Sequence, residues 1–124
     1  MQNYSIQQMA DLSAYIRTKS TKQPQATLGG DAEKGKALYI SCVPCHQTNG
    51  FGNKDLKAPS LAGLPDYYIF KQLQNFKSEL RGSGSGDKTG KMMQISAKML
   101  QDDQAMKDVA AYISSLKIKK PSSK

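Results

Sequence analysis

The 124-residue sequence is poor in the residues that usually build a large core. It contains no tryptophan, and aromatic residues make up only 7% of the chain. Its length accommodates one domain of about 100 residues and an appendage. Small domains with so little apolar material usually depend on an additional stabilising group. We therefore expect something other than protein to contribute to the core.

Long apolar runs are absent as well. No run approaches the roughly 20 residues that a helix needs to cross a bilayer, so no membrane span is expected. The N-terminus does not resemble a signal peptide, because Asp11 and several polar residues interrupt it.

Cysteine and histidine are scarce and concentrated in one place. The two cysteines, Cys42 and Cys45, and the single histidine, His46, form the run Cys-Val-Pro-Cys-His. C-x-x-C-H is the attachment motif of c-type haem. Cysteines three residues apart share a face of a helical turn, so both thiols can bond to the vinyl groups of one porphyrin. The motif predicts one covalent haem c whose iron is bound by His46, with a sixth ligand that is not histidine.

Three other interpretations use the same residues. A zinc site needs about four ligands, and the chain offers no further cysteine or histidine. A thioredoxin-like dithiol also contains C-x-x-C with proline, but its fold needs β-α-β patterning, and this sequence has almost no strand-like alternation. A structural disulfide would leave His46 unexplained. Haem attachment accounts for all three residues.

Apolar spacing predicts an all-α protein. We expect helices over residues 4–19, from the cap Asp31 into the haem motif, from the cap Asp66, and after Asp102. A flexible polar linker over residues 20–30, an irregular loop over 47–60 and a glycine-rich break over 81–87 separate them. The inward positions are Ile6, Met9, Leu12 and Ile16 in the first helix; Gly35, Leu38, Tyr39 and Cys42 in the second; Ile69, Leu73, Phe76 and Leu80 in the third; and Met106, Val109, Tyr112, Ile113 and Leu116 in the last.

The first and last of these helices contain an internal repeat. Residues 7–16 and 104–113 are identical at six of ten positions, at an offset of 97 residues. Convergence of two amphipathic helices would explain this. Alternatively, the N-terminal segment is the last helix of a preceding domain of the same type. Its apolar face then needs cover from its own domain or from a second chain, which predicts a homodimer through this helix.

The ordered set of motifs resembles class I cytochromes c over residues 29–118. It is most similar to domains of bacterial di-haem cytochromes c and to the cytochrome c tails of oxidase copper subunits. The resemblance implies three main helices around a covalent haem, with residues 1–28 as an additional helix and linker and 119–124 as a basic tail. The matching motifs are Gly35-Lys36-Ala37-Leu38-Tyr39, Ala58-Pro59-Ser60-Leu61-Ala62-Gly63, Tyr68, Gln72-Leu73, Phe76 and Val109-Ala110-Ala111-Tyr112-Ile113.

The resemblance assigns roles to several of these residues. Gly35 and Tyr39 are expected to meet Val109 and Tyr112 where the first and last helices of the domain cross. The carbonyl of Pro59 is expected to accept the ring N–H of the proximal histidine, which fixes its tautomer. Two positions depart from the family pattern: Gln47 replaces the glycine that commonly follows the haem histidine, and Leu64 stands where glutamine is common.

The sixth ligand in this family is a methionine between the glycine-rich break and the last helix. Met92, Met93 and Met99 lie there. Family spacing favours Met93, with Met92 as the alternative, whereas Met99 is expected in the core at helical spacing from Met106. For each of them, a role as a flexible gap-filler is the competing explanation.

Histidine and methionine ligation stabilises ferrous iron and leaves no position for a substrate. The resemblance therefore implies a non-enzymatic periplasmic electron carrier between respiratory redox partners, from which a signal or preceding domain is absent. A methionine made labile by the glycine-rich run would instead give a haem enzyme or a gas-binding domain.

The charge is strongly positive, with 18 basic and 10 acidic residues and a net charge of +8. A solvated lysine surface explains this, as does steering toward a partner with an acidic docking surface. The lysines are spread along the chain without a nucleic-acid motif, so nucleic acid is not an expected partner. Lys54, Lys57, Lys88 and Lys91 are the candidate docking residues.

Overall fold

The chain folds into helices joined by loops. The computed structural model describes residues 4–18 and 22–118, and within these ranges it has no β-strand beyond an isolated bridge between Asn53 and Ala58. The predicted all-α class is therefore confirmed, while the predicted tail over 119–124 lies outside the described residues. The elements are α1 (Ile6–Thr18), α2 (Ala32–Tyr39), the 3-10 turn η1 (Ile40–Cys42), α3 (Val43–His46), α4 (Asp66–Lys77), α5 (Lys88–Lys98) and α6 (Asp103–Ser114).

Two predicted caps define the starts of α2 and α6. The carboxylate of Asp31 accepts hydrogen bonds from the backbone N–H groups of Glu33 and Lys34, at 3.0 and 3.3 Å. Asp102 accepts one from Ala105 at 2.8 Å. Such bonds satisfy N–H groups that have no partner within the helix.

Helices α2 and α6 cross closely at Gly35. A Cβ at this position would lie 1.9 Å from the carbonyl oxygen of Asp108, so only glycine permits the approach. Beside the crossing, the rings of Tyr39 and Tyr112 pack with their centroids 5.3 Å apart and their planes at 49°. Val109 is buried. The crossing predicted from the family resemblance is confirmed.

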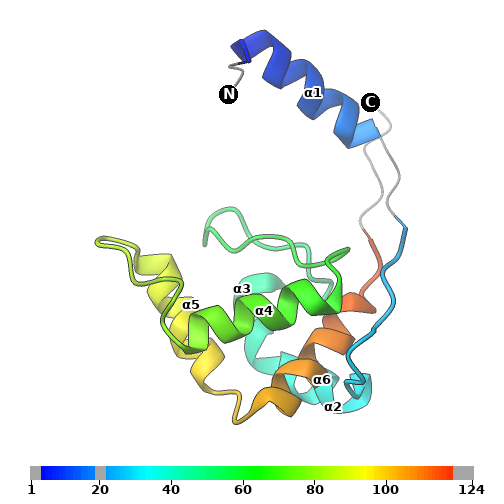
Figure 1. Cartoon of the computed structure of the whole chain (residues 1–124), viewed down its shortest axis with the longest axis vertical. Helices are drawn as coiled ribbons and strands as arrows, with labels where there is room; N and C mark the ends of the chain where they lie inside the picture. Colours follow the sequence, from blue (N-terminus) through cyan, green and yellow to red (C-terminus); the bar gives the residue numbers. More distant parts are fainter. Residues whose placement is uncertain (1–3, 19–21, 119–124) are drawn as a thin grey trace.

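The core lies where α4 packs on both α5 and α6, with α2 on the far side of α6 (Figure 1). Because α2, α4, α5 and α6 all contribute to it, the core joins these four helices. Its buried members are Tyr39, Ile69, Leu73, Phe76, Ala97, Leu100, Met106, Val109, Ala110 and Ile113.

The predicted role of Asp66 as the cap of α4 is wrong. The helix begins at Asp66 itself, and its carboxylate is fully buried. That carboxylate accepts hydrogen bonds from Thr27 N at 2.6 Å, Thr27 Oγ1 at 2.9 Å and Leu28 N at 2.9 Å. Burial alone would raise the pKa of Asp66, but the hydrogen bonds outweigh it and lower the pKa below its ordinary value. Asp66 thus binds a distant segment of the chain.

Helix α5 was not predicted, because its first turns adjoin the glycine-rich run and themselves contain Gly90. Asp87 caps it by accepting a hydrogen bond from Gly90 N at 2.8 Å. The methionines at 92 and 93 therefore lie on a helix rather than in a loop.

Two residues predicted in the core are exposed. Leu80 is 80% exposed because α4 ends at Lys77, and Met99 is 64% exposed because α6, the helix that holds Met106, begins only at Asp103. Beyond a helix end, the spacing of three or four residues no longer keeps side chains on one face. Both predictions extended a helical stripe past one end of its helix.

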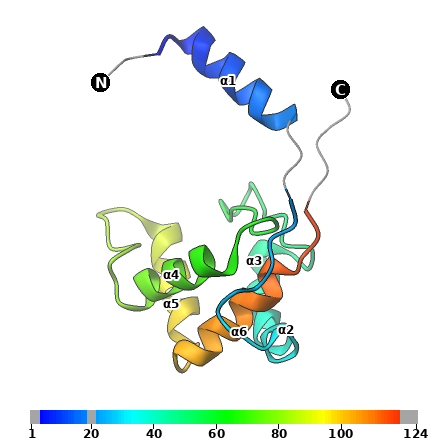
Figure 2. The same ribbon diagram turned by 45° about the vertical axis from the view of Figure 1, so that its right-hand side comes forward.

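Residues 22–30, here called the strap, are held against the domain rather than free. Gln23 donates to the carbonyl oxygens of Ser114 and Leu116, both at 2.8 Å, and accepts from the N–H of Ile118 at 3.2 Å. Farther along, the strap is bound by Asp66. Two views show it running beside the C-terminal segment (Figures 1 and 2). The flexible linker predicted here is therefore wrong for the described part.

Helix α1 stands clear of the other helices at the end of the strap (Figures 1 and 2). The predicted helix is confirmed, and its apolar side chains are exposed, from 51% for Met9 to 84% for Ile6. In the described residues its own domain does not cover this face, so cover by a second chain stays a prediction. No helix within residues 4–18 and 22–118 is long and apolar enough to cross a bilayer.

Candidate haem-attachment site

The C-x-x-C-H motif spans the turn η1 and the short helix α3, which continue directly from α2. Pro44 stands in the first turn of α3, where its missing N–H costs no helical hydrogen bond. Cys42 and Cys45 are half-buried free thiols on successive turns. The helix crossing at Gly35 therefore fixes the base from which both thiols project.

His46 is 6% exposed and hydrogen-bonded through its ring. Its Nδ1 lies 2.9 Å from the carbonyl oxygen of Pro59, and since a carbonyl only accepts, Nδ1 carries the proton. Nε2 is then the nitrogen with a lone pair for a metal. Burial lowers the pKa of His46, and the bond to Pro59 opposes this only partly. The imidazole is therefore neutral at pH 7, as a metal ligand must be.

The loop after the motif folds back to bring Pro59 to the histidine. Gly52 N donates to the carbonyl of His46 at 3.1 Å, and the bridge between Asn53 and Ala58 closes the loop. A Cβ at Gly52 would lie 2.5 Å from Ala58 O. Gly52 thus allows the two limbs to approach, and the loop supplies the acceptor for Nδ1.

Gln47 adopts an unusual backbone conformation directly after the histidine. Its φ of 68° and ψ of 161° fall in a region occupied almost only by glycine. Its carbonyl oxygen accepts a hydrogen bond from the hydroxyl of Tyr39 at 2.6 Å. Burial, followed by the neighbouring Cys42 and Tyr112, raises the pKa of Tyr39 to about 12. Tyr39 therefore stays a neutral donor and connects the helix crossing to the motif.

The environment of Cys42 is unlike that of a catalytic thiol. Burial raises its pKa, Cys45 adds to the rise, and a hydrogen bond from Ser41 opposes it. Reactive cysteines of dithiol enzymes have lowered pKa values near positive charge or helix N-termini. The thiol oxidoreductase interpretation gains no support from this geometry.

Among the three candidate methionines, only Met93 packs on the core, where it is half-buried. It lies four and seven residues before the buried Ala97 and Leu100, on the inward side of α5. Met92 is 60% exposed and Met99 64% exposed. The structure thus distinguishes Met93 by burial, while its role as a ligand stays a prediction.

The residues present fit haem c. They supply two free thiols, a neutral imidazole with an available Nε2, and a thioether on a separate helix. Apolar side chains that the protein leaves half-buried would gain further cover from a porphyrin. One of them is Val43, which is half-buried within the motif itself, between the two cysteines.

The sequence did not indicate the role of Gln94, which is buried beside Met93. A signal existed, because Gln94 lies three residues before Ala97 and would share its inward face once α5 is recognised. The signal was missed because Gln94 is polar and because the nearby glycines obscured the helix α5.

Comparison with known proteins agrees with this site. The profile of the Cytochrome c family matches residues 32–117. Cytochrome c4 of Azotobacter vinelandii is 33% identical over 129 residues, which cover 94% of this chain and 57% of the relative. The thiosulfate dehydrogenase electron acceptor of Thiomonas intermedia is 37% identical over 77 residues, covering 62% of this chain and 32% of the relative.

A solved structure gives the same result for the fold. The crystal structure of reduced recombinant cytochrome c4 from Pseudomonas stutzeri matches with a TM-score of 0.69 and 26% identity, over 90% of this chain and 61% of that one. The chain spans less than two thirds of the length of these relatives. The predicted class I fold and haem c cofactor are confirmed, and the chain belongs to the cytochrome c family.

Proposed function

We propose that the chain is a mono-haem electron-transfer domain in which Cys42 and Cys45 hold the haem and His46 and Met93 are the axial ligands. The observation that carries this proposal is the buried, neutral His46, whose Nδ1–H bond to Pro59 leaves Nε2 for iron. Haem c, when bound, supplies an iron that takes up and releases one electron. The thiols fix the group covalently, and the hydrogen bond orients the imidazole.

Met93 determines which chemistry is available. His46 and Met93 would hold the iron from the protein, and a small molecule would then have no free site on the metal. The domain then acts as a carrier rather than an enzyme, and the electron crosses between proteins. A relative named as an electron acceptor supports this function. Thioether ligation also favours the ferrous form and raises the reduction potential.

Exposed lysines provide the docking surface in this proposal. Lys54, Lys57, Lys88 and Lys91 are all exposed. Lys91 approaches Glu79 only at 4.0 Å, with both side chains largely solvated, so its charge remains available. An acidic redox partner would bind transiently, through an interface below about 1,200 Å². Its association rate should fall as salt rises.

The ligand assignment is tested with the full chain loaded with haem. Ferric wild-type protein should be low-spin, with a weak sulfur-to-iron band at the red end of its spectrum. Met93→Ala should abolish this band and lower the reduction potential. Met92→Ala should change neither, because Met92 is exposed. Loss of the band in Met92→Ala alone would assign the ligand to Met92. A high-spin wild-type protein that takes up cyanide quickly would indicate an enzyme or gas-binding domain.

We further propose that α1 is the equivalent of α6 in a preceding domain of the same type, in a periplasmic parent protein. The support is the repeat: in α6 the shared Met106, Ile113 and Ala111 are buried against the domain, whereas their counterparts in α1 are exposed. In this chain alone, the face would associate with a second copy. Sedimentation of the wild type and of the double variant Leu12→Ser, Ile16→Ser tests this, and equal monomeric masses would exclude the homodimer.

A further inference from the structure

Helix α5 carries Met93, and it is anchored to few other elements. It packs chiefly on α4. Two of its further contacts are ion pairs from Lys91 and Lys98 to Glu79, at 4.0 and 3.3 Å, and all three side chains are about half exposed or more. Exposed pairs of this kind contribute little. The rotation of α5 about its axis must therefore be fixed by its buried contacts, which include Ala97 in the core.

Gln94 is the buried polar residue of this helix. It is 1% exposed, although Met92, two residues before it, and Ile95, directly after it, are each 60% exposed. Burying an amide is unfavourable unless hydrogen bonds replace those to water. The Gln94 amide is therefore expected to have hydrogen-bond partners within the protein.

Both amide protons of Gln94 are used to bind the glycine-rich segment. Nε2 donates to the carbonyl oxygen of Arg81 at 2.7 Å and to Ser83 Oγ at 2.8 Å. Ser83 Oγ in turn donates to the carbonyl oxygen of Glu79 at 2.8 Å. The segment just after α4 is thus connected to the middle of α5 through one side chain.

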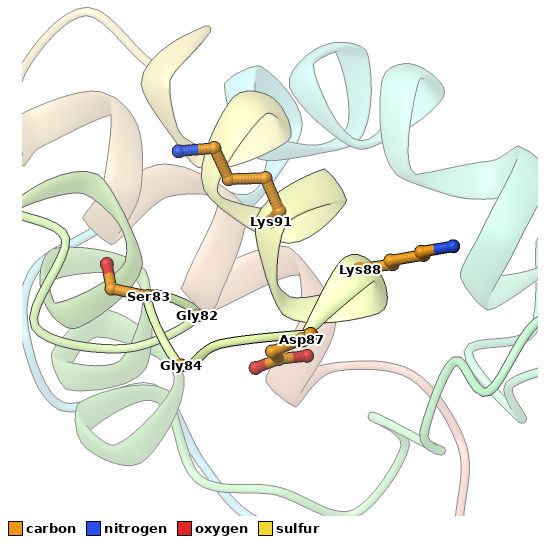
Figure 3. A pocket seen from close by; sticks show the side chains of 7 residues that line it. Gly82, Ser83, Gly84, Asp87, Lys88 and Lys91 are labelled. Carbon is orange, nitrogen blue, oxygen red and sulfur yellow. The ribbon is translucent and has the colours of Figure 1, made fainter.

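Gly82 brings this segment close enough. Its φ is +87°, and a Cβ there would lie 2.5 Å from Gly90 O and 3.1 Å from Gln94 Cγ. Figure 3 shows Gly82 and Ser83 on the loop that passes beside α5, with the Lys88 side chain pointing away from them. The glycine-rich run is therefore a packed contact with α5 at this point.

The acceptor of Gln94 is left without a partner. Within the described residues, Gln94 Oε1 is a buried oxygen with no hydrogen bond. Such an atom is costly, and native proteins rarely retain one without a reason. The amide cannot turn to relieve it, because an oxygen would then face the carbonyl of Arg81. The two donor bonds thus fix the side chain in one orientation.

We propose that Gln94 is a positioning residue for the sixth ligand. By tying α5 to Arg81 and Ser83, it sets the rotation of the helix and presents the thioether of Met93 toward the iron. This inference rests on the proposed function. Without the tie, α5 would still pack on α4 through Ala97 and Leu100, but the methionine would leave the metal more readily.

The test uses full-length, haem-loaded Gln94→Leu and Gln94→Glu. Leucine removes both donor bonds with little change in volume, and glutamate keeps the shape without the donors. We expect each to accelerate cyanide uptake by about tenfold, the factor that corresponds to the loss of buried hydrogen bonds. The sulfur-to-iron band should also disappear at a pH about one unit lower than in wild type. Unchanged cyanide rates and band in both variants would overturn the proposal.

Two control variants separate positioning from general weakening. Gln23→Ala removes the strap bonds far from α5 and should lower stability while leaving the cyanide rate as in wild type. Gln101→Glu makes the same chemical change at an exposed site and should alter neither. If Gln23→Ala accelerates cyanide uptake as much as Gln94→Leu, Gln94 is merely structural and the proposal fails.

Ser83→Ala keeps the proposal testable if the Gln94 variants do not fold. It removes one acceptor at an exposed site, and uptake should accelerate by roughly threefold; no change would count against the proposal. Met93→Ala separates the two levels of inference. If it leaves the wild-type spectrum intact, the ligand assignment fails and this inference with it. If it abolishes the band while the Gln94 variants keep it, only the positioning role is lost.

Discussion

Helices α1 and α6 share six of ten residues over the repeat but differ completely in burial. In α6 the positions Met106, Val109 and Ile113 are almost fully buried. Their counterparts Met9, Leu12 and Ile16 in α1 are each more than half exposed. The same amphipathic pattern therefore specifies a helix in both places, and only one of the two finds a surface that fits it.

The fitting surface is formed by α2 and α4, which pack on different sides of α6. Gly35 lets the backbone of α6 approach to a distance that any Cβ would prevent, and Tyr39 packs on Tyr112 beside it. In the described residues, α6 packs on the face of α2 at Gly35, and α1 packs on neither α2 nor α4. Burial of a helix is thus a property of the pair, whereas helix formation is encoded locally.

Matched substitutions in the two helices give the largest expected contrast. Met106→Ala removes a buried side chain and should lower the free energy of unfolding by about 2–5 kcal/mol. Met9→Ala, at the equivalent repeat position, should change it by no more than about 0.5 kcal/mol. Urea denaturation of the haem-loaded chain at low protein concentration measures both. Equal losses would mean that α1 is packed in solution.

The strap lies between α1 and α2 in the chain, and Asp66 tests whether it is firmly held. Asp66→Asn replaces an acceptor of three hydrogen bonds and should cost about 1–3 kcal/mol. The folded-state pKa of Asp66 is lowered, so its contribution is complete above the unfolded pKa near 4 and is lost as pH falls through the folded value.

The stability gap between wild type and Asp66→Asn should therefore be constant above about pH 5 and shrink below about pH 4. Thermal unfolding across this range measures the gap. Asp55→Asn, at an exposed loop position, is the matched control and should show almost no gap. A gap for Asp66→Asn that does not change with pH would show that the carboxylate is not held ionised.

A smaller change in the free energy of unfolding is expected from a substitution at Gln47, where the α2–α6 pair meets the haem motif. Gln47→Gly relieves a backbone conformation that disfavours side chains and keeps the carbonyl that Tyr39 binds. It should raise the free energy of unfolding by about 1 kcal/mol, since strain in this region costs about 1–3 kcal/mol and glycine loses more entropy on folding. The control is Thr48→Gly at the next residue, which should not raise the free energy of unfolding. A destabilised Gln47→Gly would mean that its side chain is needed.

Local features of the sequence were sufficient for most of the fold. Periodicity and caps located α1, α2, α4 and α6, and the motif located the cysteines and histidine. The contact between His46 and Pro59 followed from the family resemblance. These features lie within a few residues of one another or recur in a fixed order.

The errors came from interactions between distant segments. Asp66 is the first residue of α4, next to the cap position, yet its carboxylate binds partners 38 and 39 residues away. Leu80 continued an apolar stripe beyond the end of α4, and Met99 extended the stripe of α6 to before its start. The spacing of Gln94 from Ala97 indicates its burial only once α5 is recognised, and its bonds to Arg81 and Ser83 cross from α5 to the segment after α4. The strap looked flexible from its composition, but Gln23 holds it to the end of α6.

Covalent attachment tests the central claim most directly. After denaturation and removal of free haem, the mass of the wild-type chain should exceed the sequence mass by one haem. Neither cysteine should react with an alkylating agent after reduction. The double variant Cys42→Ala, Cys45→Ala should have its sequence mass alone. Covalent haem in the double variant, or a haem-free wild-type chain whose two thiols are alkylated, would contradict the account.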